Sequence, residues 1–328
     1  MPDISEIAPA KSRGRLVSLY QLAIVLGINL IYFVNLRIAA MGDEAWNVDR
    51  GWRYMLASGM LPAVLFLVLL LFVPESPRWL TAKGRKDEAM DILKKVNGEE
   101  VASVVHKEIV DALGHETGTL KELFRPGLRM AMLVGVFLAF FCQITGINAI
   151  IYYAPEIFKN AGFGTESAFT QTVIIGVVNT LFTFLAIWLI DKAGRRALLL
   201  WGVTGMIVCL FAVAFCYHYH IGGFWLLICI LGYIACFASS LGPVPWVIMA
   251  EIFPTRSRGV AMSFATVVLW VGVLLITQLT PVMLDKLKGT KTFLLFMVNA
   301  IILLVFTWKR IPETRQRTLE DIEKSWTR

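Results

Sequence analysis

The hydrophobic positions of this chain fall into long continuous runs, and the polar and charged positions gather between them. Eight runs reach or approach the roughly 20 residues that a helix needs to cross a bilayer, and none contains Asp, Glu, Lys, Arg or His. They are Leu16–Leu36, Tyr54–Val73, Met130–Tyr153, Ala168–Ile190, Ala197–Tyr217, Phe224–Met249, Val260–Met283 and Phe293–Trp308. The last run is short, and we expect Thr290–Thr292 to complete it. Because the runs are continuous and do not alternate, they predict spanning helices and not barrel strands.

Composition supports a membrane protein. Apolar residues make up 57% of the chain and charged residues 17%, whereas a soluble domain has about 45–50% and about 25%. All five cysteines lie inside the runs, without the spacing of a metal site or a disulfide framework: Cys142, Cys209, Cys216, Cys229 and Cys236. We therefore expect small apolar fillers at these positions, and no metal or other cofactor.

Basic residues are distributed unequally between the two sides of the predicted membrane. The loops on one side hold 24 Lys and Arg residues, and those on the other side hold seven. Basic residues concentrate on the cytoplasmic side, so both termini are predicted to be cytoplasmic. This asymmetry accounts for the net charge of +7 without a nucleic-acid partner, and the lipid bilayer is the expected surrounding.

A long polar loop over residues 74–129 divides the chain. Ser76-Pro77 is typical of a helix start, and "GRKDEAMDILKKVNG" predicts an amphipathic helix that ends at Gly98. Its apolar face would hold Ala89, Ile92, Leu93 and Val96. "VASVVHKEIVDAL" predicts a second such helix, with a plain linker as the alternative. The expected units are residues 1–73, 74–129, 130–310 and a tail over 311–328.

Two distant segments repeat each other. "SEIAPAKSRG" (Ser5 to Gly14) and "AEIFPTRSRG" (Ala250 to Gly259) agree at six of ten positions. Each precedes two spans, the second of which ends in "PES" or "PET". Transporters are commonly built from such repeats. A complete unit would have six spans, so we expect a whole second unit and a first unit that lacks four spans.

Six motifs occur in order along the chain: "RGRLVSLYQLAIVLGI", "PESPRWL", "QITGINAIIYYAPEIF", "DKAGRR", "GPVPWVIMAEIFPTRSRG" and "PETRQRTLEDIE". Together they closely resemble the sugar-porter branch of the major facilitator superfamily, and bacterial hexose and pentose carriers most of all. The resemblance implies a multi-pass protein of the plasma (inner) membrane. The expected fold is all-α, with eight transmembrane helices: the last two of an N-terminal bundle and a complete C-terminal six-helix bundle.

A sugar is a neutral polyol that needs hydrogen bonds and apolar contact but no countercharge, so amides and aromatic rings suit it. The resemblance implies a substrate site made of Gln21, Gln143, Asn148, Asn179, Trp246 and Trp270, with Tyr152 and Tyr153 as a gate. Gly146, between two of the amides, would let its helix bend. From the residues alone, each amide could equally make an interhelical hydrogen bond.

The chain departs from the family pattern at three positions. Cys142 stands where a first glutamine is usual, and Leu269 and Val273 stand where polar residues are expected beside Trp270. These departures predict fewer hydrogen bonds to the substrate and leave its identity open.

The resemblance also implies a set of charged residues that close the cytoplasmic side: Glu6, Arg13, Asp191, Arg195, Arg196, Glu251 and Arg258. Ion pairs at such an interface can bias a two-state equilibrium, because rocking makes or breaks them. Simple anchoring by basic residues is the alternative, but it does not explain the acids.

The sequence therefore predicts transport of a monosaccharide, a hexose or a pentose, by alternating access. The alternatives are a sugar-binding sensor and a non-transporting relic, and we expect little transport by this chain alone. An enzyme is disfavoured because no nucleophile–base, metal or phosphate-loop pattern occurs. Proton coupling stays open, since no span carries an acid.

Overall fold

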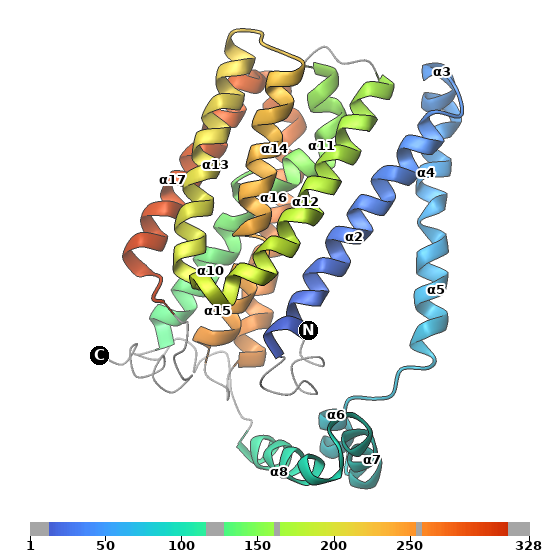
Figure 1. The fold of residues 1–328 in the computed structure, drawn as a ribbon, viewed down its shortest axis with the longest axis vertical. Coiled ribbons are helices and arrows are strands. Elements are labelled where there is room, and N and C mark those ends of the chain that lie inside the picture. Colours follow the sequence, from blue (N-terminus) through green and yellow to red (C-terminus); the bar gives the residue numbers. More distant parts are fainter. Residues whose placement is uncertain (1–12, 116–127, 161–164, 254–257, 314–328) are drawn as a thin grey trace.

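The structure is a computed structural model that describes residues 13–115, 128–160, 165–253 and 258–313. Every regular element in these residues is a helix (Figure 1). Eight helical stretches are long and apolar enough to cross a membrane, as the eight apolar runs predicted. They begin and end as follows: α2 (Arg13–Ala39); α3 (Glu44–Trp46), the π-helix η1 (Asn47–Gly51), α4 (Trp52–Ser58) and α5 (Met60–Leu70) in succession; α10 (Leu128–Ile144) with α11 (Ile147–Asn160); α12 (Thr165–Ala193); α13 (Arg195–His218); α14 (Phe224–Ser239) with α15 (Val244–Ile252); α16 (Arg258–Lys286); and α17 (Lys288–Arg310).

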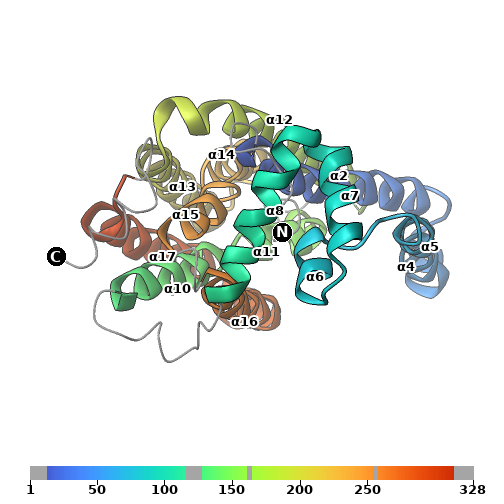
Figure 2. The same ribbon diagram turned by 90° about the horizontal axis from the view of Figure 1, so that it is seen from below.

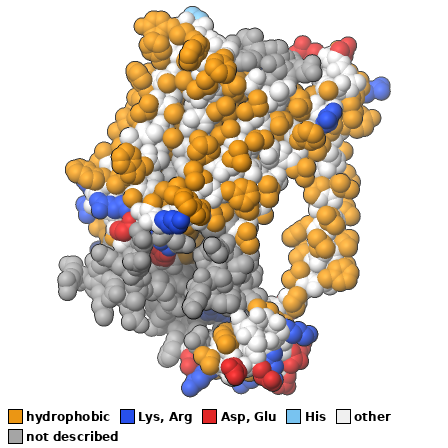
Figure 3. Space-filling model, in the orientation of Figure 1, with side chains coloured by type: hydrophobic (Ala, Val, Ile, Leu, Met, Phe, Trp, Pro, Cys, Tyr) orange, Lys and Arg blue, Asp and Glu red, His pale blue; other side chains and the backbone are white. Residues whose placement is uncertain are grey.

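The surface has the form of a membrane protein. Apolar side chains cover the flanks of the helices, and charged side chains gather toward the two ends (Figure 3). No residue of α5 is buried, and large aliphatic side chains project from it all round. Such a surface is stable in lipid and unstable in water. The chain is thus an all-α, multi-pass membrane protein.

The spans from α10 to α17 form one bundle around a continuous apolar core, which includes Leu138, Ile150, Met206 and Phe296. Within it, α13 packs against α14 and α17, and α10 packs against α16. Helix α2 lies along the outside of α12, while α4 and α5 stand at the edge of the molecule (Figures 1 and 2). We call the end with Ala39, Asn160 and His218 the upper end, and the end with Arg195 and Arg310 the lower end.

Small residues bring α13 and α14 together. A Cβ added to Gly205 would lie 2.5 Å from the Cys236 sulfur, and one added to Gly232 would lie 2.9 Å from the Cys209 sulfur. Small side chains at helix contacts allow the close approach that association in lipid requires. All five cysteines are free thiols: Cys142 and Cys216 are buried, and Cys209, Cys229 and Cys236 are half-buried.

The second span differs from its predicted limits. It was expected to begin at Tyr54, but helical structure begins at Glu44, and it ends at Leu70 instead of Val73. The polar connection forms helix because its own side chains cap the turns: Asp43 accepts from the Trp46 amide at 2.8 Å, and the Asn47 amide donates to the Ala39 carbonyl at 2.9 Å.

Two spans that were predicted as continuous helices are broken. The third is interrupted after Ile144, where Gly146 has φ +97°, and it continues to Asn160. The sixth is interrupted between α14 and α15, from Ser240 to Pro243. The last span is longer than its apolar core and includes Thr292, as expected.

Helices α6 (Pro77–Ala82), α7 (Lys86–Asn97) and α8 (Glu99–His115) form a small cluster beyond the lower end of the spans (Figures 1 and 2). Pro77 opens α6 and Gly98, at φ +81°, follows α7, so this loop is helical and not a plain linker. Leu93, Ala102 and Ile109 form its buried centre. The prediction for Val96 was wrong: it is 50% exposed, because α8 covers the adjacent face of α7.

Replacing Gly146 with alanine is expected to lower the free energy of unfolding by about 2–4 kcal/mol. The positive φ disfavours a side chain, and the added Cβ would lie 2.5 Å from the Phe296 ring. Thermal unfolding of the detergent-purified protein measures this effect. Gly27→Ala is the control, because nothing lies within 4 Å of its added Cβ. Equal losses in the two variants would contradict the prediction.

Candidate functional site

The break between α10 and α11 is the centre of the candidate site. At the break, backbone carbonyls inside the bundle lack a donor from their own helix, and side chains of two other helices donate to them. The Asn299 amide of α17 donates to the Ile144 carbonyl at 3.1 Å, and the Tyr233 hydroxyl of α14 donates to the Thr145 carbonyl at 3.1 Å. Because a carbonyl without a partner is costly in an apolar interior, these two side chains stabilise the break.

Gln143 and Asn148 meet across this break. Gln143 is the residue before the end of α10, and Asn148 is the second residue of α11. The Asn148 amide nitrogen donates to the Gln143 side-chain oxygen at 2.7 Å, and both side chains are half-buried. Each amide has donor and acceptor capacity beyond this one bond. Two predicted substrate residues thus form one polar unit, which we call the amide pair.

The two predicted gate residues follow the amide pair on α11. Tyr152 is 51% exposed. Tyr153 lies at a kink, with φ −107° and ψ 16°, and its hydroxyl donates to the Thr277 carbonyl of α16 at 2.9 Å. That carbonyl would otherwise take the N–H of residue 281, but Pro281 has none. Tyr153 is therefore fixed in place, whereas Tyr152 projects from the surface.

The other four predicted substrate residues come from four different helices. Asn179 is buried on α12, and Gln21 is half-buried on α2, which packs along α12. Trp246 is half-buried on α15 against the core. Trp270 is 61% exposed on α16, and the structure does not bring it against the core as it does Trp246. Of the six predicted substrate residues, Gln143 and Asn148 are the two that hydrogen-bond to each other in the described structure.

The structure accounts for the three departures from the family pattern. Cys142 is buried, and it lies between the Ala139 carbonyl at 3.3 Å and the Gln143 amide nitrogen at 3.2 Å. Leu269 and Val273 are also buried, on the face of α16 that packs into the core. All three positions are therefore filled by packing side chains, which reduces the hydrogen bonds available to a ligand.

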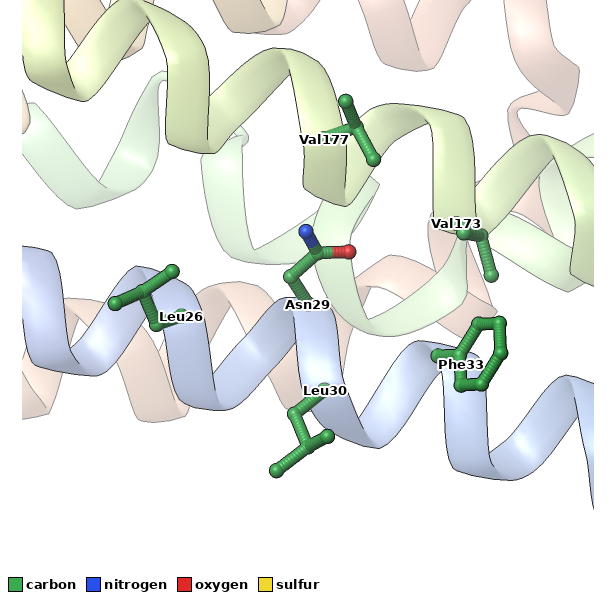
Figure 4. A pocket seen from close by; sticks show the side chains of 6 residues that line it. All are labelled: Leu26, Asn29, Leu30, Phe33, Val173 and Val177. Atoms are coloured by element: carbon green, nitrogen blue, oxygen red, sulfur yellow. The ribbon is translucent and has the colours of Figure 1, made fainter.

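A groove of about 350 Å³ lies between α2 and α12 (Figure 4). Leu26, Asn29, Leu30 and Phe33 line it from α2, and Val173 and Val177 from α12. None of the predicted substrate residues lines this groove. Its walls are partly exposed aliphatic side chains, the Phe33 ring and one amide, so it suits acyl chains better than a hydroxyl-rich ligand.

A charged cluster occupies the lower end. The Arg195 guanidinium donates to a Glu251 carboxylate oxygen at 3.1 Å, and the two side chains are 13% and 25% exposed. This pair belongs to the predicted charge set. Arg196 instead donates to the Trp308 carbonyl at 2.6 Å, at the end of α17. Glu6 lies outside the described residues, and so do the side chains of Arg13, Asp191 and Arg258.

Sequence reasoning missed Glu313, which completes this cluster. Its two carboxylate oxygens accept from the backbone N–H groups of Arg195 and Arg196, at 3.0 and 3.1 Å. Glu313 thus caps the first turn of α13, where the helix dipole favours an anion. Gly194 makes room for it, since a Cβ there would lie 2.7 Å from the carboxylate. The repeated "PES" and "PET" motifs carried the signal, because each holds an acid directly after a span.

Asn299 and Tyr233 were missed as well. A polar residue in each of these apolar spans was visible in the sequence, but its partner was not, because Asn299 is 155 positions from Ile144.

The chemistry of the assembled site follows from its parts. Amides and aromatic rings in charge-free spans suit a neutral, hydroxyl-rich ligand. Among the described residues, no cluster of His, Cys, Asp or Glu could hold a metal ion.

Comparison with known proteins places the chain among transporters. The family model described as "Sugar (and other) transporter" matches residues 3–326. The arabinose-proton symporter of Bacillus subtilis is 44% identical over 325 residues, which cover 98% of this chain and 70% of that protein. The D-xylose-proton symporter of Escherichia coli is 41% identical over 330 residues, which cover 98% of this chain and 67% of that protein.

Solved structures agree with this fold. The major facilitator superfamily proton:xylose symporter XylE, bound to 6-bromo-6-deoxy-D-glucose, matches with a TM-score of 0.82 at 40% identity. That match covers 98% of this chain and 69% of that structure. A partially occluded inward-open form of XylE from E. coli matches with a TM-score of 0.85 at 38% identity, over 97% of this chain and 67% of that structure.

Glu313→Gln is expected to destabilise the protein by about 1–2 kcal/mol, because it weakens two charge-assisted hydrogen bonds at a helix N-terminus. Thermal unfolding in detergent measures the loss. Glu88→Gln is the matched control, since Glu88 pairs with Arg85 on the exposed surface of the small helical cluster and should have no measurable effect. A Glu313 variant as stable as this control would show that the cap contributes nothing.

Proposed function

The chain belongs to the sugar transporter family of the major facilitator superfamily, and from this premise we propose that it binds a monosaccharide and moves it across a membrane by alternating access. Two of its relatives are named as sugar-proton symporters, and it is a transporter-family protein and not an enzyme. The proposed substrate is a hexose or a pentose. The observation that carries this proposal is the amide pair at the break of a charge-free span.

The amide pair supports a polyol site for a physical reason. Gln143 and Asn148 hold each other at 2.7 Å, so neither amide has to be ordered anew when a ligand arrives. Sugar hydroxyls donate and accept, as amides do, and need no charge. Trp246 would cover an apolar face of the ring, and Asn179, Gln21 and Trp270 would contribute from neighbouring helices. The buried Cys142, Leu269 and Val273 favour a ligand held by few hydrogen bonds.

The Arg195–Glu251 pair joins α13 to α15 and is partly dry. It would hold the lower ends of these two helices together while the six-helix bundle moves as a unit during alternating access. We place the lower end and the helices α6 to α8 in the cytoplasm, on the strength of the basic residues there, and the protein in the plasma membrane. Residues 1–73 and 130–310 would be the two parts that move relative to each other.

A second candidate function is sugar binding without transport, as in a sensor. The exposed, unburied α5 favours it, because the two-span unit of the described residues offers little surface against which the six-helix bundle could rock. Both candidates require the same sugar site. Binding and uptake must therefore be measured separately.

Gln143→Ala, Asn148→Ala and Trp246→Ala are each expected to weaken sugar binding about tenfold, because each removes a direct contact or the partner that orders it. Isothermal titration of the detergent-purified protein with D-xylose, L-arabinose and D-glucose in turn measures the affinity. Gln278→Ala is the matched control, an exposed amide on α16. Unchanged affinity in all three site variants, for a sugar that the unaltered protein binds, would overturn the site.

Labelled-sugar uptake into proteoliposomes separates transport from sensing, with empty vesicles as the baseline. Alternating access predicts uptake above the baseline that Asn148→Ala abolishes, because that change removes a proposed sugar contact. Sugar binding without uptake above the baseline would favour sensing over transport.

A further inference from the structure

Pro155 removes a hydrogen bond from the gate segment of α11. In an α-helix the N–H of one residue donates to the carbonyl four residues earlier, so the Ile151 carbonyl would take the N–H of residue 155. Proline has no N–H. The helix is also kinked here, since Tyr153 has non-helical backbone angles. The Ile151 carbonyl, directly before both predicted gate residues, therefore depends on a donor from elsewhere.

Tyr32 of α2 supplies that donor. Its hydroxyl donates to the Ile151 carbonyl at 2.6 Å, across 119 positions of sequence. Gly176 of α12 makes the approach possible, because a Cβ there would lie 3.1 Å from the Tyr32 ring and 2.7 Å from the Asn29 amide oxygen. A carbonyl without a hydrogen-bond donor among apolar groups costs free energy, and this hydrogen bond removes that cost.

The same arrangement occurs a second time in the molecule. Pro281 frees the Thr277 carbonyl of α16, and the Tyr153 hydroxyl donates to it at 2.9 Å. There is one difference between the two. Tyr153 joins two helices of the six-helix bundle, whereas Tyr32 joins the bundle to α2, which lies on its outside (Figure 1).

The Tyr32 hydrogen bond is therefore sensitive to the position of α2. When α2 lies against the bundle, the Ile151 carbonyl is satisfied by a protein donor. When α2 and α11 separate, no backbone N–H can take over, and water must enter at the kink to satisfy the carbonyl. The separated and closed arrangements thus differ by one partly buried hydrogen bond, which is what a two-state element requires.

We propose that Tyr32 is a positioning residue for the gate: its hydroxyl latches the kinked half of α11 to α2 through the Ile151 carbonyl that Pro155 leaves open. The latch holds Tyr152 and Tyr153 near α2 and keeps the upper end closed. Its role in gating rests on the proposed function, while the latch itself rests only on the described contacts.

The test is a double-mutant cycle read by hydrogen–deuterium exchange of the full chain in detergent, without sugar. Tyr32→Phe removes only the hydroxyl, and exchange of peptides within residues 151–160 is expected to accelerate about three- to fivefold. Pro155→Ala restores a backbone N–H for the Ile151 carbonyl. In that background the same Tyr32→Phe change is expected to alter exchange by less than about 1.5-fold, because the carbonyl is satisfied within its own helix.

Tyr217→Phe is the matched control. The Tyr217 hydroxyl of α13 donates to another carbonyl of α11, that of Ile157, at 3.0 Å, but within the six-helix bundle. Its effect on exchange should be the same with proline or alanine at position 155. If Pro155→Ala does not yield folded protein, Pro155→Gly supplies the same N–H and completes the cycle.

Equal effects of Tyr32→Phe in both backgrounds, or no effect in either, would overturn the latch. Sugar titration of the same variants tests the proposed function separately. A coupled exchange effect in a protein that binds none of the three sugars would sustain the latch and reject the function. Sugar binding together with an uncoupled exchange effect would do the reverse.

Discussion

The structure depends on one constraint: a backbone carbonyl inside an apolar bundle needs a hydrogen-bond donor, even where the helix that owns it is broken. The chain opens its helices at several places, and at four freed carbonyls a side chain from another helix supplies the donor. Asn299 and Tyr233 do so at the Gly146 break, and Tyr153 and Tyr32 at carbonyls freed by proline. These irregular points of the helices are therefore points at which helices are joined. The candidate site lies at the Gly146 break.

Much of the fold could be predicted from the sequence, because length and hydropathy alone define a spanning helix. The eight spans and the small helical cluster were found in this way, and Gly146 was expected to bend its helix. The break itself and the helical start of the second span were not found, since side-chain caps such as Asp43 and Asn47 override the polar character of that connection. Both caps are local in sequence, but hydropathy alone does not detect them.

The candidate site was predictable only in part, for the same reason. Gln143 and Asn148 are close in sequence, and the break brings them into contact. Arg195 and Glu251 both belong to the predicted charged set, and the structure pairs them with each other. Tyr32 and Asn299, however, act on carbonyls more than 100 positions away, and a carbonyl leaves no trace in the identity of its residue. The Ile151 carbonyl is marked by Pro155, four positions later, and the Ile144 carbonyl by Gly146, two positions later, but neither mark identifies the donor.

The cap that Glu313 forms on α13 has a consequence for biosynthesis. The carboxylate lies 118 positions after the Arg195 amide that it accepts, and the intervening chain contains α13 to α17. A ribosome therefore completes α13 and four more helical segments before the residue that closes its first turn has been made. Until then, two backbone amides beside two arginines must be hydrated or screened at the membrane surface. The bundle acquires this cap only when translation has passed α17, so the capped form of α13 exists only after α14 to α17 have been made.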